Sequence, residues 1–179
     1  MKNNIYRAFF ASVALYLSTG ASAQNPQTDY MAILKAAGFT NINVVSFAET
    51  KKKHALTFLY RSDTDKDPLT IFAEISPTKE GADLAFRVYR PCVQSNGKLQ
   101  NQIIVISGQK IETSYGCAMS PHETKTQEIY IIKSLAGNDF AKKEFTESKY
   151  VVVDIFGLDL LISTEGFPQA LAASSGKAL

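Results

Sequence analysis

Cys92 and Cys117 are the only two cysteines of this chain, and they suggest two kinds of chemistry. In an oxidising compartment two such cysteines are expected to form a disulfide. A bridge closing a loop of about 26 residues would stabilise the fold by roughly 3 to 3.5 kcal/mol in the chain-entropy model. Alternatively, Cys117 precedes His122 closely, and an imidazole can activate a thiolate nucleophile. The disulfide is the favoured interpretation, because a thiol with a partner in such a compartment seldom stays reduced.

An acidic segment resembles the ligand spacing of a calcium-binding loop. Asp63, Asp65, Asp67 and Glu74 fall at positions one, three, five and twelve of such a loop. Position six requires a sharp turn that glycine makes, and Pro68 stands there with its φ fixed at a negative value. The flanking residues also resemble strands rather than helices. We therefore expect an exposed acidic hairpin loop, with these four carboxylates only weak metal candidates, and no cofactor.

Other catalytic patterns are incomplete. His54 and His122 are the only histidines, so a three-histidine zinc site is excluded, and no second histidine follows His122 at the spacing of a helical metalloprotease. Ser107 lacks the Gly-x-Ser-x-Gly elbow of serine hydrolases and is better placed in a hairpin turn. Asp154 and Asp159 are expected on opposite sides of a hairpin turn, where solvation is the commonest role of such acids. A hydrolase without a recognisable motif remains an alternative, with His122 and Asp154 as its first candidates.

The N-terminus has the pattern of a cleavable secretory signal. Lys2 and Arg7 make a positive start, Ala8–Leu17 is a continuous apolar run, and small residues then end in Ala-x-Ala at Ala23. The apolar run is shorter than the roughly 20 residues that span a bilayer, and no cysteine follows the cleavage site for lipid attachment. We expect residues 1–23 to be removed and residues 24–179 to form one domain, without a transmembrane anchor, in the periplasm or secreted.

The charge of the chain changes when this signal is removed. The whole chain has 19 basic and 17 acidic residues, and the signal takes Lys2 and Arg7 with it, which leaves 17 of each. Nucleic-acid binding draws most of its affinity from a positive excess, so that class of function is not expected. The Lys51–Lys53 run is the only basic cluster. It is interpreted as a solvated turn between two strands, with contact to an anionic surface as the alternative.

The hydrophobic pattern predicts a mostly β fold of the α+β class. A short helix is expected from Thr28 or Asp29 to Ala37, ended by Gly38, and a second from about Phe167 to Ala173. Between them the apolar residues alternate, which is typical of strands, and the short connections favour antiparallel pairing. We therefore expect a curved antiparallel sheet or a β-sandwich with a short helix near each end. The expected strands are Ile42–Val45, Ala55–Tyr60, Leu69–Ile75, Leu84–Tyr89, Ile103–Ile106, Ile111–Tyr115, Ile129–Ile132, Tyr150–Phe156 and Leu160–Ile162.

The last third of the chain resembles one known family. Tyr115-Gly116-Cys117-Ala118, the segment Ile132–Gly137 and the stretch Leu160–Leu171, with its Gly-Phe-Pro-Gln-Ala-Leu end, resemble the close of the invasion-associated locus B family. Members of that family are exported bacterial proteins. The resemblance implies a periplasmic or envelope protein linked to association with host cells, and it brings no catalytic residues to this chain.

Two classes of function follow from these observations. The favoured one is an exported, non-enzymatic envelope or secreted protein that binds a protein or cell-surface partner through its sheet face or its loops. A periplasmic immunity protein that blocks a toxin is an alternative within this class. The other class is the hydrolase without a recognisable motif. No catalytic residue is assigned, and the disulfide between Cys92 and Cys117 is the one structural site that the sequence predicts.

Overall fold

A computed structural model describes residues 26–78, 81–90, 92, 99–119 and 126–175 of the chain. The predicted signal peptide, residues 1–23, and His122 lie outside the described residues, so the predictions that concern them stay predictions.

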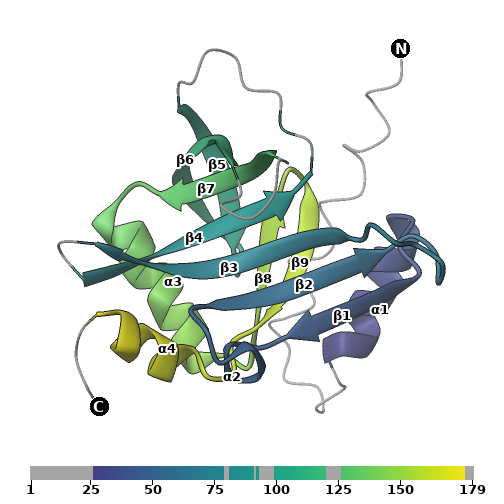
Figure 1. Cartoon of the computed structure of the whole chain (residues 1–179), viewed down its shortest axis with the longest axis horizontal. Coiled ribbons are helices and arrows are strands. Elements are labelled where there is room, and N and C mark those ends of the chain that lie inside the picture. Colours follow the sequence, from purple (N-terminus) through teal and green to yellow (C-terminus); the bar gives the residue numbers. More distant parts are fainter. Residues whose placement is uncertain (1–25, 79–80, 91, 93–98, 120–125, 176–179) are drawn as a thin grey trace.

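One nine-stranded antiparallel sheet makes up most of the fold (Figure 1). The spatial order of its strands is β1-β2-β3-β4-β7-β6-β5-β8-β9, and every neighbouring pair is antiparallel. The prediction of a mostly β, antiparallel fold is thus confirmed. The strands are β1 (Asn41–Val45), β2 (His54–Tyr60), β3 (Leu69–Thr78), β4 (Gly81–Tyr89), β5 (Gln100–Ile106), β6 (Gln109–Met119), β7 (Thr126–Ile132), β8 (Tyr150–Ile155) and β9 (Leu158–Ser163).

The sheet curls until its two ends nearly meet. In Figure 1, β8 and β9 lie behind β2 and β3 and cross them at a steep angle. A buried hydrogen bond marks this approach, because the Thr57 hydroxyl of β2 donates to the Leu161 carbonyl of β9 over 2.6 Å. Strand twist makes such coiling natural in a large sheet. Of the two expected architectures, the structure has the single curved sheet.

Alternation along the strands separates an inner from an outer face. In β2 the inward residues are Ala55, Thr57 and Leu59, all fully or almost fully buried, while the residues between them are partly exposed. The same period of two recurs in β3, β4 and β8. The inner face therefore forms the core. Its largest buried side chains are Leu59, Ile71, Ile75, Leu84, Phe86, Ile104, Ile106 and Tyr130.

Four helices accompany the sheet: α1 (Pro26–Ala36), α2 (Phe47–Thr50), α3 (Leu135–Glu147) and α4 (Phe167–Ser174). Helices α1 and α4 confirm the two that the sequence predicts. The rings of Phe47 in α2, Phe145 in α3 and Phe167 in α4 contact one another edge-on or tilted, with ring centroids 5.2 to 6.5 Å apart. The ring of Phe86 in β4 contacts that of Phe145, with centroids 6.2 Å apart. This cluster of phenylalanines fastens the three helices to the sheet.

Helix α3 is the main element that the sequence analysis missed. Its start is capped by Ser134, whose hydroxyl accepts a hydrogen bond from the Gly137 amide. Only Asn138, Ala141 and Phe145, together with Gly137, are buried. The apolar stripe is therefore too narrow to stand out, although the spacing of 138, 141 and 145 and the serine before them were signals for a helix.

Two strand pairs are closed by two-residue turns in which both residues have positive φ. Ser107 and Gly108 close β5 and β6 with φ of 48° and 83°, and Phe156 and Gly157 close β8 and β9 with 59° and 75°. Such turns match the twist of a hairpin. The strands expected from the sequence, Tyr150–Phe156 and Leu160–Ile162, left Gly157–Asp159 for the second turn, whereas the structure begins this turn one residue earlier, at Phe156. Asp159 lies in β9 instead, and this changes its neighbours.

Candidate functional site

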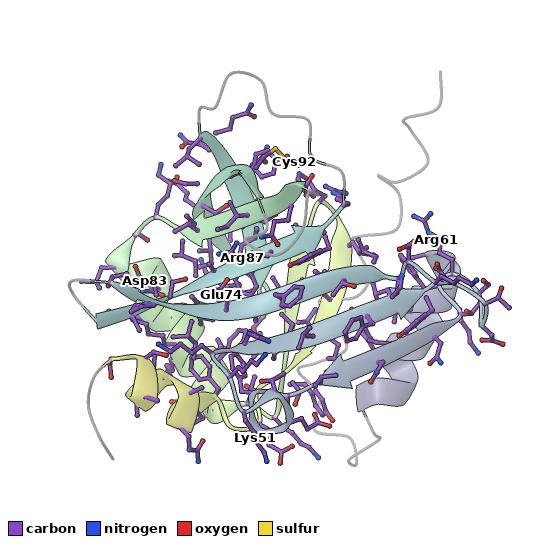
Figure 2. The ribbon with its side chains drawn as sticks, in the orientation of Figure 1. Lys51, Arg61, Glu74, Asp83, Arg87 and Cys92 are labelled. Carbon is purple, nitrogen blue, oxygen red and sulfur yellow. A yellow bond between two sulfur atoms is a disulfide. The ribbon has the colours of Figure 1, made fainter. Side chains whose placement is uncertain are left out.

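The predicted disulfide between Cys92 and Cys117 is present in the structure. The bridge joins the segment after β4 to β6, with the two Cα atoms 5.8 Å apart, and Figure 2 shows Cys92 at the end of the molecule near β5 and β6. Because the Cys117 sulfur is bonded to Cys92, it has no free thiolate. The alternative role of Cys117 as a nucleophile is therefore not compatible with this structure.

A buried carboxylate, Glu128 of β7, lies close to this disulfide. Glu128 is only 5% exposed, and it accepts hydrogen bonds from the Tyr130 hydroxyl at 3.0 Å and the Tyr115 hydroxyl at 3.3 Å. Arg90, just after β4, approaches it with Nε 2.8 Å from Oε2. The Tyr115 hydroxyl is also 3.6 Å from the Cys92 sulfur. We call Arg90, Tyr115, Glu128, Tyr130 and Phe156 the Glu128 cluster.

The electrostatics of the Glu128 cluster keep its two tyrosines protonated. Burial, and then the negative charge of Glu128, raise the pKa of both Tyr115 and Tyr130. Burial opposes the charge of Arg90, but the hydrogen bond and charge of Glu128 outweigh it and raise the pKa of Arg90. Both phenols are therefore donors and the guanidinium is charged. The buried carboxylate has the three partners that its burial requires.

Phe156 completes the cluster from the tip of the β8–β9 hairpin. Its ring contacts Tyr130 and Tyr115 with centroids 5.4 and 6.0 Å apart, and the Arg90 guanidinium lies 4.5 Å from the ring centroid. The residue is nevertheless 51% exposed, and its φ of 59° is unusual for a bulky side chain. The aromatic contacts of the ring hold the backbone of Phe156 in a left-handed conformation that asparagine or glycine adopts more readily.

Sequence reasoning did not identify the Glu128 cluster. One signal was present, because Glu128 has the same parity as Tyr130 and Ile132, which face the core from β7. A charged residue at an inward position calls for a partner. That partner could not be found from the sequence, since Arg90 follows another strand. The Glu128 carboxylate thus has its described partners within the cluster, where it links the segment after β4 to β6 and β7.

The acidic residues of the calcium-like pattern do not converge. Asp63, Asp65 and Asp67 lie in the β2–β3 turn, where the Asp65 carboxylate accepts hydrogen bonds from the Arg61 and Asp67 amides over 3.1 Å. Glu74 lies well along β3 and forms an ion pair with Arg87. Within the described ranges, no group of three or more histidine, cysteine, aspartate and glutamate side chains is arranged to hold a metal ion.

Asp154 and Asp159, in contrast, are closer than the sequence analysis expected. The corrected turn puts them directly opposite each other in β8 and β9. Burial, and then the charge of Asp154, raise the pKa of Asp159. One buried oxygen of Asp154, Oδ1, has no hydrogen-bond partner in the structure. The backbone carbonyl of Asp159 accepts a hydrogen bond from the hydroxyl of Tyr30 in α1. Two charged carboxylates this close repel each other, which costs stability.

His54 lies on the outer face of the sheet, opposite Glu74. Burial, and then the charge of Lys52, lower the pKa of its imidazole, while Glu74 opposes them. The ring packs edge-on against Phe72 with centroids 5.6 Å apart. Lys51, Lys52 and Lys53 are exposed, as the sequence predicts, but they connect helix α2 to β2 rather than one strand to another.

The outer face of β2, β3, β4 and β7 carries apolar side chains in register. One row across these strands is Leu56, Phe72, Arg87 and Ile129, and the Phe72 ring packs on that of Tyr89 at 4.9 Å. Figure 2 shows Glu74 and Arg87 pointing toward each other on the neighbouring strands β3 and β4. In Figure 1 no described helix lies in front of these strands. We call Leu56, Phe72, Arg87, Tyr89 and Ile129 the outer apolar face.

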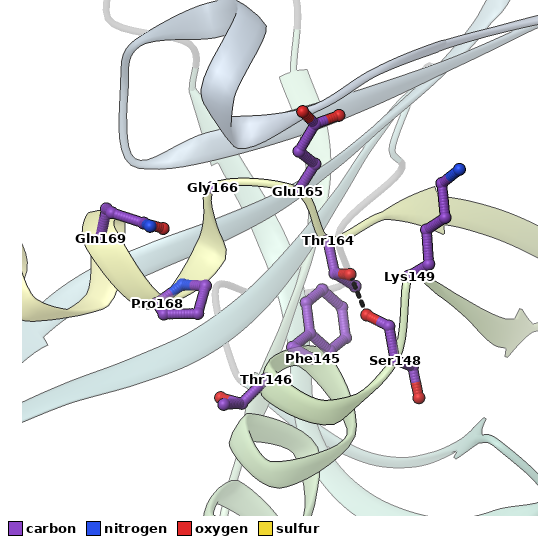
Figure 3. Close-up of a pocket in the computed structure, with 9 residues that line it drawn as sticks. All are labelled: Phe145, Thr146, Ser148, Lys149, Thr164, Glu165, Gly166, Pro168 and Gln169. Carbon is purple, nitrogen blue, oxygen red and sulfur yellow. Dashed lines mark hydrogen bonds between the residues drawn. The ribbon is translucent and has the colours of Figure 1, made fainter.

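A shallow depression of about 300 Å³ lies where α3 ends and α4 begins (Figure 3). Both threonine hydroxyls that line it are bound to the backbone: Thr164 donates to the Ser148 carbonyl and Thr146 to the Lys142 carbonyl. Lys149 and Glu165 extend away from Phe145 at its centre. Gly166 has a φ of 81°, and a Cβ there would lie 2.6 Å from the Ala48 amide nitrogen. The absence of a side chain at Gly166 thus permits the close approach of α2 to the start of α4 beside the depression.

Comparison with protein-family models, curated proteins and solved structures finds no significant match to this chain. Among the helices that the structure describes, none is long and apolar enough to cross a membrane. The outer apolar face is the described surface that carries the proposal below.

Proposed function

We propose that this protein is an exported, non-enzymatic binding protein that contacts a protein partner through the outer apolar face. The observation that carries the proposal is the row of Leu56, Phe72, Arg87 and Ile129, which lies in register on the outer side of the sheet. Aromatic side chains and arginine are enriched in protein interfaces and dominate their binding energy. The Cys92–Cys117 bridge supports the exported location, since such bridges persist in oxidising compartments.

The composition of the outer apolar face fits a protein partner better than a small ligand. The face is a sheet surface rather than a pocket, and small molecules are usually held in concave sites. Phe72 and Tyr89 supply area that is partly exposed, and the Arg87–Glu74 pair beside them supplies polar groups for orientation. A partner with an apolar centre and a polar rim would match this pattern.

Site-specific photo-crosslinking tests this proposal. Benzoylphenylalanine is placed at position 72 of the full chain, which is expressed with its N-terminal segment in the exporting cell. Leu135 gives a matched control, because it is an apolar residue of α3 that is 72% exposed but lies in a different part of the surface. We expect a discrete adduct from position 72 and none of that size from position 135.

A competition experiment shows whether the adduct depends on the outer apolar face. Unlabelled protein in excess should remove the adduct, whereas the variant Phe72→Ser with Tyr89→Ser should not compete. Circular dichroism and thermal melting verify that the variant is folded. Absence of an adduct from position 72, or equal adducts from positions 72 and 135, would refute the proposal.

The resemblance of the last third of the chain to the invasion-associated locus B family extends the proposal. It suggests that the partner belongs to the bacterial envelope or to the surface of a host cell. Deletion of the gene should then reduce association of the bacterium with host cells, and the outer-face variant should fail to restore it. Restoration by that variant would separate any such role from the outer apolar face.

An immunity protein that blocks a toxin is the second form of the same proposal. It would use the same face, but its partner would be a toxin encoded close by, and co-expression would protect cells from that toxin. A hydrolase based on His122 and Asp154 stays a prediction of the sequence, because His122 lies outside the described residues; Asp154 itself lies opposite Asp159.

A further inference from the structure

Strand β5 extends beyond the strand that pairs with its outer edge. Strand β8 pairs with β5 only at Val105 and Ile106. The chain then turns into β9 at Phe156, at the level that Ile103 has in the continued register. On its other edge β5 stays paired with β6 down to Gln100. Within the described residues, Asn101 to Ile103 therefore have a strand on one side only.

The N–H and C=O groups of successive residues in β5 point alternately toward β6 and toward the β8 side, and this alternation shows which of them face the open edge. The Ser107 amide donates to the Val152 carbonyl of β8 over 3.0 Å, so residue 107 points its backbone groups toward β8. In an antiparallel pair the direction alternates from one residue to the next. The backbone groups of Val105, Ile103 and Asn101 therefore point the same way, and those of Ile104 and Gln102 point toward β6. At Ile103 and Asn101 two N–H and two C=O groups face outward.

Exposed apolar side chains lie on both sides of this open edge. Ile103 is 58% exposed on the outer face of β5, and Phe156 is 51% exposed at the tip of the neighbouring hairpin. The Phe156 ring is turned toward Tyr115, which lies opposite Gln100 across the β5–β6 pair. A strand added here would therefore meet Ile103 with one set of side chains and Phe156 with the other set.

We propose that the open edge of β5 at Asn101–Ile103 binds an extended apolar peptide segment of another protein by strand addition. Alternating outward donors and acceptors are satisfied best by a second extended backbone, which is the mode of recognition known as β-augmentation. The edge contains no proline or bulge and Ile103 is apolar; the one charged group described beside it is the Lys133 ammonium, which donates to the Asn101 side-chain oxygen over 3.2 Å. The segment takes the place that β8 would hold if it continued past its turn.

A short peptide fits this edge better than a second copy of the chain. Stable interfaces bury about 800 Å² on each partner. The open edge spans three residues, about 10 Å of strand, and the hairpin tip at Phe156 ends it on one side. A second copy placed edge to edge would gain too little area for a stable dimer. This site is separate from the outer apolar face, so either proposal can fail while the other stands.

Peptide selection with a matched chemical control tests the proposal. A phage-displayed library of random heptapeptides is panned against the oxidised protein comprising residues 24–179. Enriched peptides are then synthesised. Their binding should weaken by about tenfold or more on the variant Ile103→Pro, which deletes one outward N–H and retains the bonds to β6. Ile103→Lys provides a second variant if the proline variant does not fold. Analogues with N-methyl groups on alternate amides leave the protein unchanged, and one of the two N-methyl patterns should abolish binding.

Amide hydrogen exchange measured by NMR locates the bound peptide. We expect the amides of Asn101 and Ile103 to become protected when the peptide is added, with little change at Gln102 and Ile104, which already bond to β6. The proposal is overturned if no peptide is enriched, if the variants and N-methylated analogues bind as before, or if protection appears elsewhere. Dimerisation through β5, measured by sedimentation and lost in Ile103→Lys, would also overturn it in favour of a second copy.

Discussion

Strand β4 and the residues just after it supply two arginines that each pair with a glutamate, and the two pairs differ in their surroundings. Arg87 meets Glu74 on the outer face, where the two side chains are 23% and 31% exposed. Arg90 meets Glu128 beside the disulfide, where the glutamate side chain is 7% exposed and that of the arginine 41%. Glu128 has two tyrosine hydroxyls as additional donors. Similar residue types thus form one partly solvated pair and one pair that is part of the packed interior.

This difference shows how burial changes the contribution of an arginine–glutamate pair to stability. Water replaces a lost partner of Glu74 readily, so the outer pair contributes little to stability. Water has little access to Glu128, and a buried charge left without its partners is costly. The inner pair therefore fixes the structure, while the outer pair is available to a binding partner.

Loss of the disulfide beside the Glu128 cluster should lower the free energy of unfolding more than any other change considered. Cys92→Ser and Cys117→Ser should each lower the free energy of unfolding by roughly 3.5 kcal/mol, the value of the chain-entropy model for this loop. Urea unfolding followed by circular dichroism measures the change. Because the Cys92 sulfur lies beside Tyr115, both variants should disturb the Glu128 cluster and leave the outer apolar face unaltered. A loss in one variant only would contradict a purely structural role.

Removal of the Glu128 carboxylate should cause the second largest loss of stability. Glu128→Ala should cost about 3 kcal/mol, near the lower end for a broken buried pair, because the Arg90 guanidinium can still reach water. Urea unfolding again gives the change. Tyr115→Phe removes a single long hydrogen bond and is a control with an expected cost of about 1 kcal/mol. Equal costs for the two variants would show that the Glu128 charge is not buried in solution.

The Asp154–Asp159 pair sharpens the comparison, because Asp159 faces a carboxylate where Glu128 faces a cation. Its pKa is raised above 3.8, so the folded state binds a proton more readily than the unfolded chain. The penalty is complete above the folded pKa and disappears as the pH falls toward the unfolded value. Asp159→Asn should stabilise the protein at pH 7, and this gain should shrink near pH 4. Urea unfolding at both pH values tests it, and a gain independent of pH would refute this origin.

The outer pair should give the smallest effect. Glu74→Gln is expected to change the free energy of unfolding by less than about 1 kcal/mol, since both side chains reach water. High salt should reduce even this difference. A cost similar to that of Glu128→Ala would remove the distinction between the two regions. If the outer apolar face binds a partner, the same variant should weaken that binding while stability is retained.

Several parts of this structure could be predicted from the sequence, because local patterns determine them. The alternation in Ala55–Tyr60 and in Leu69–Ile75 predicted strands that are present, and the helix beginning at Phe167 was also found. Helix α3 was missed because its buried stripe is narrow. The β8–β9 turn was misplaced because Phe156, a residue that rarely adopts positive φ, occupies its first position. Tertiary contacts with Arg90, Tyr115 and Tyr130 override that preference.

The sequence by itself determined the class of fold, the antiparallel pairing of consecutive strands and the partner of Cys92, since these depend on alternation, short connections and a count of two cysteines. Only the tertiary structure decided which residues from distant strands meet. Glu128 and Arg90, Asp154 and Asp159, and the open edge of β5 all depend on strand register, and a shift of one residue in register reverses the face of every side chain. The candidate sites of this protein are therefore properties of register, which no local pattern in the sequence specifies.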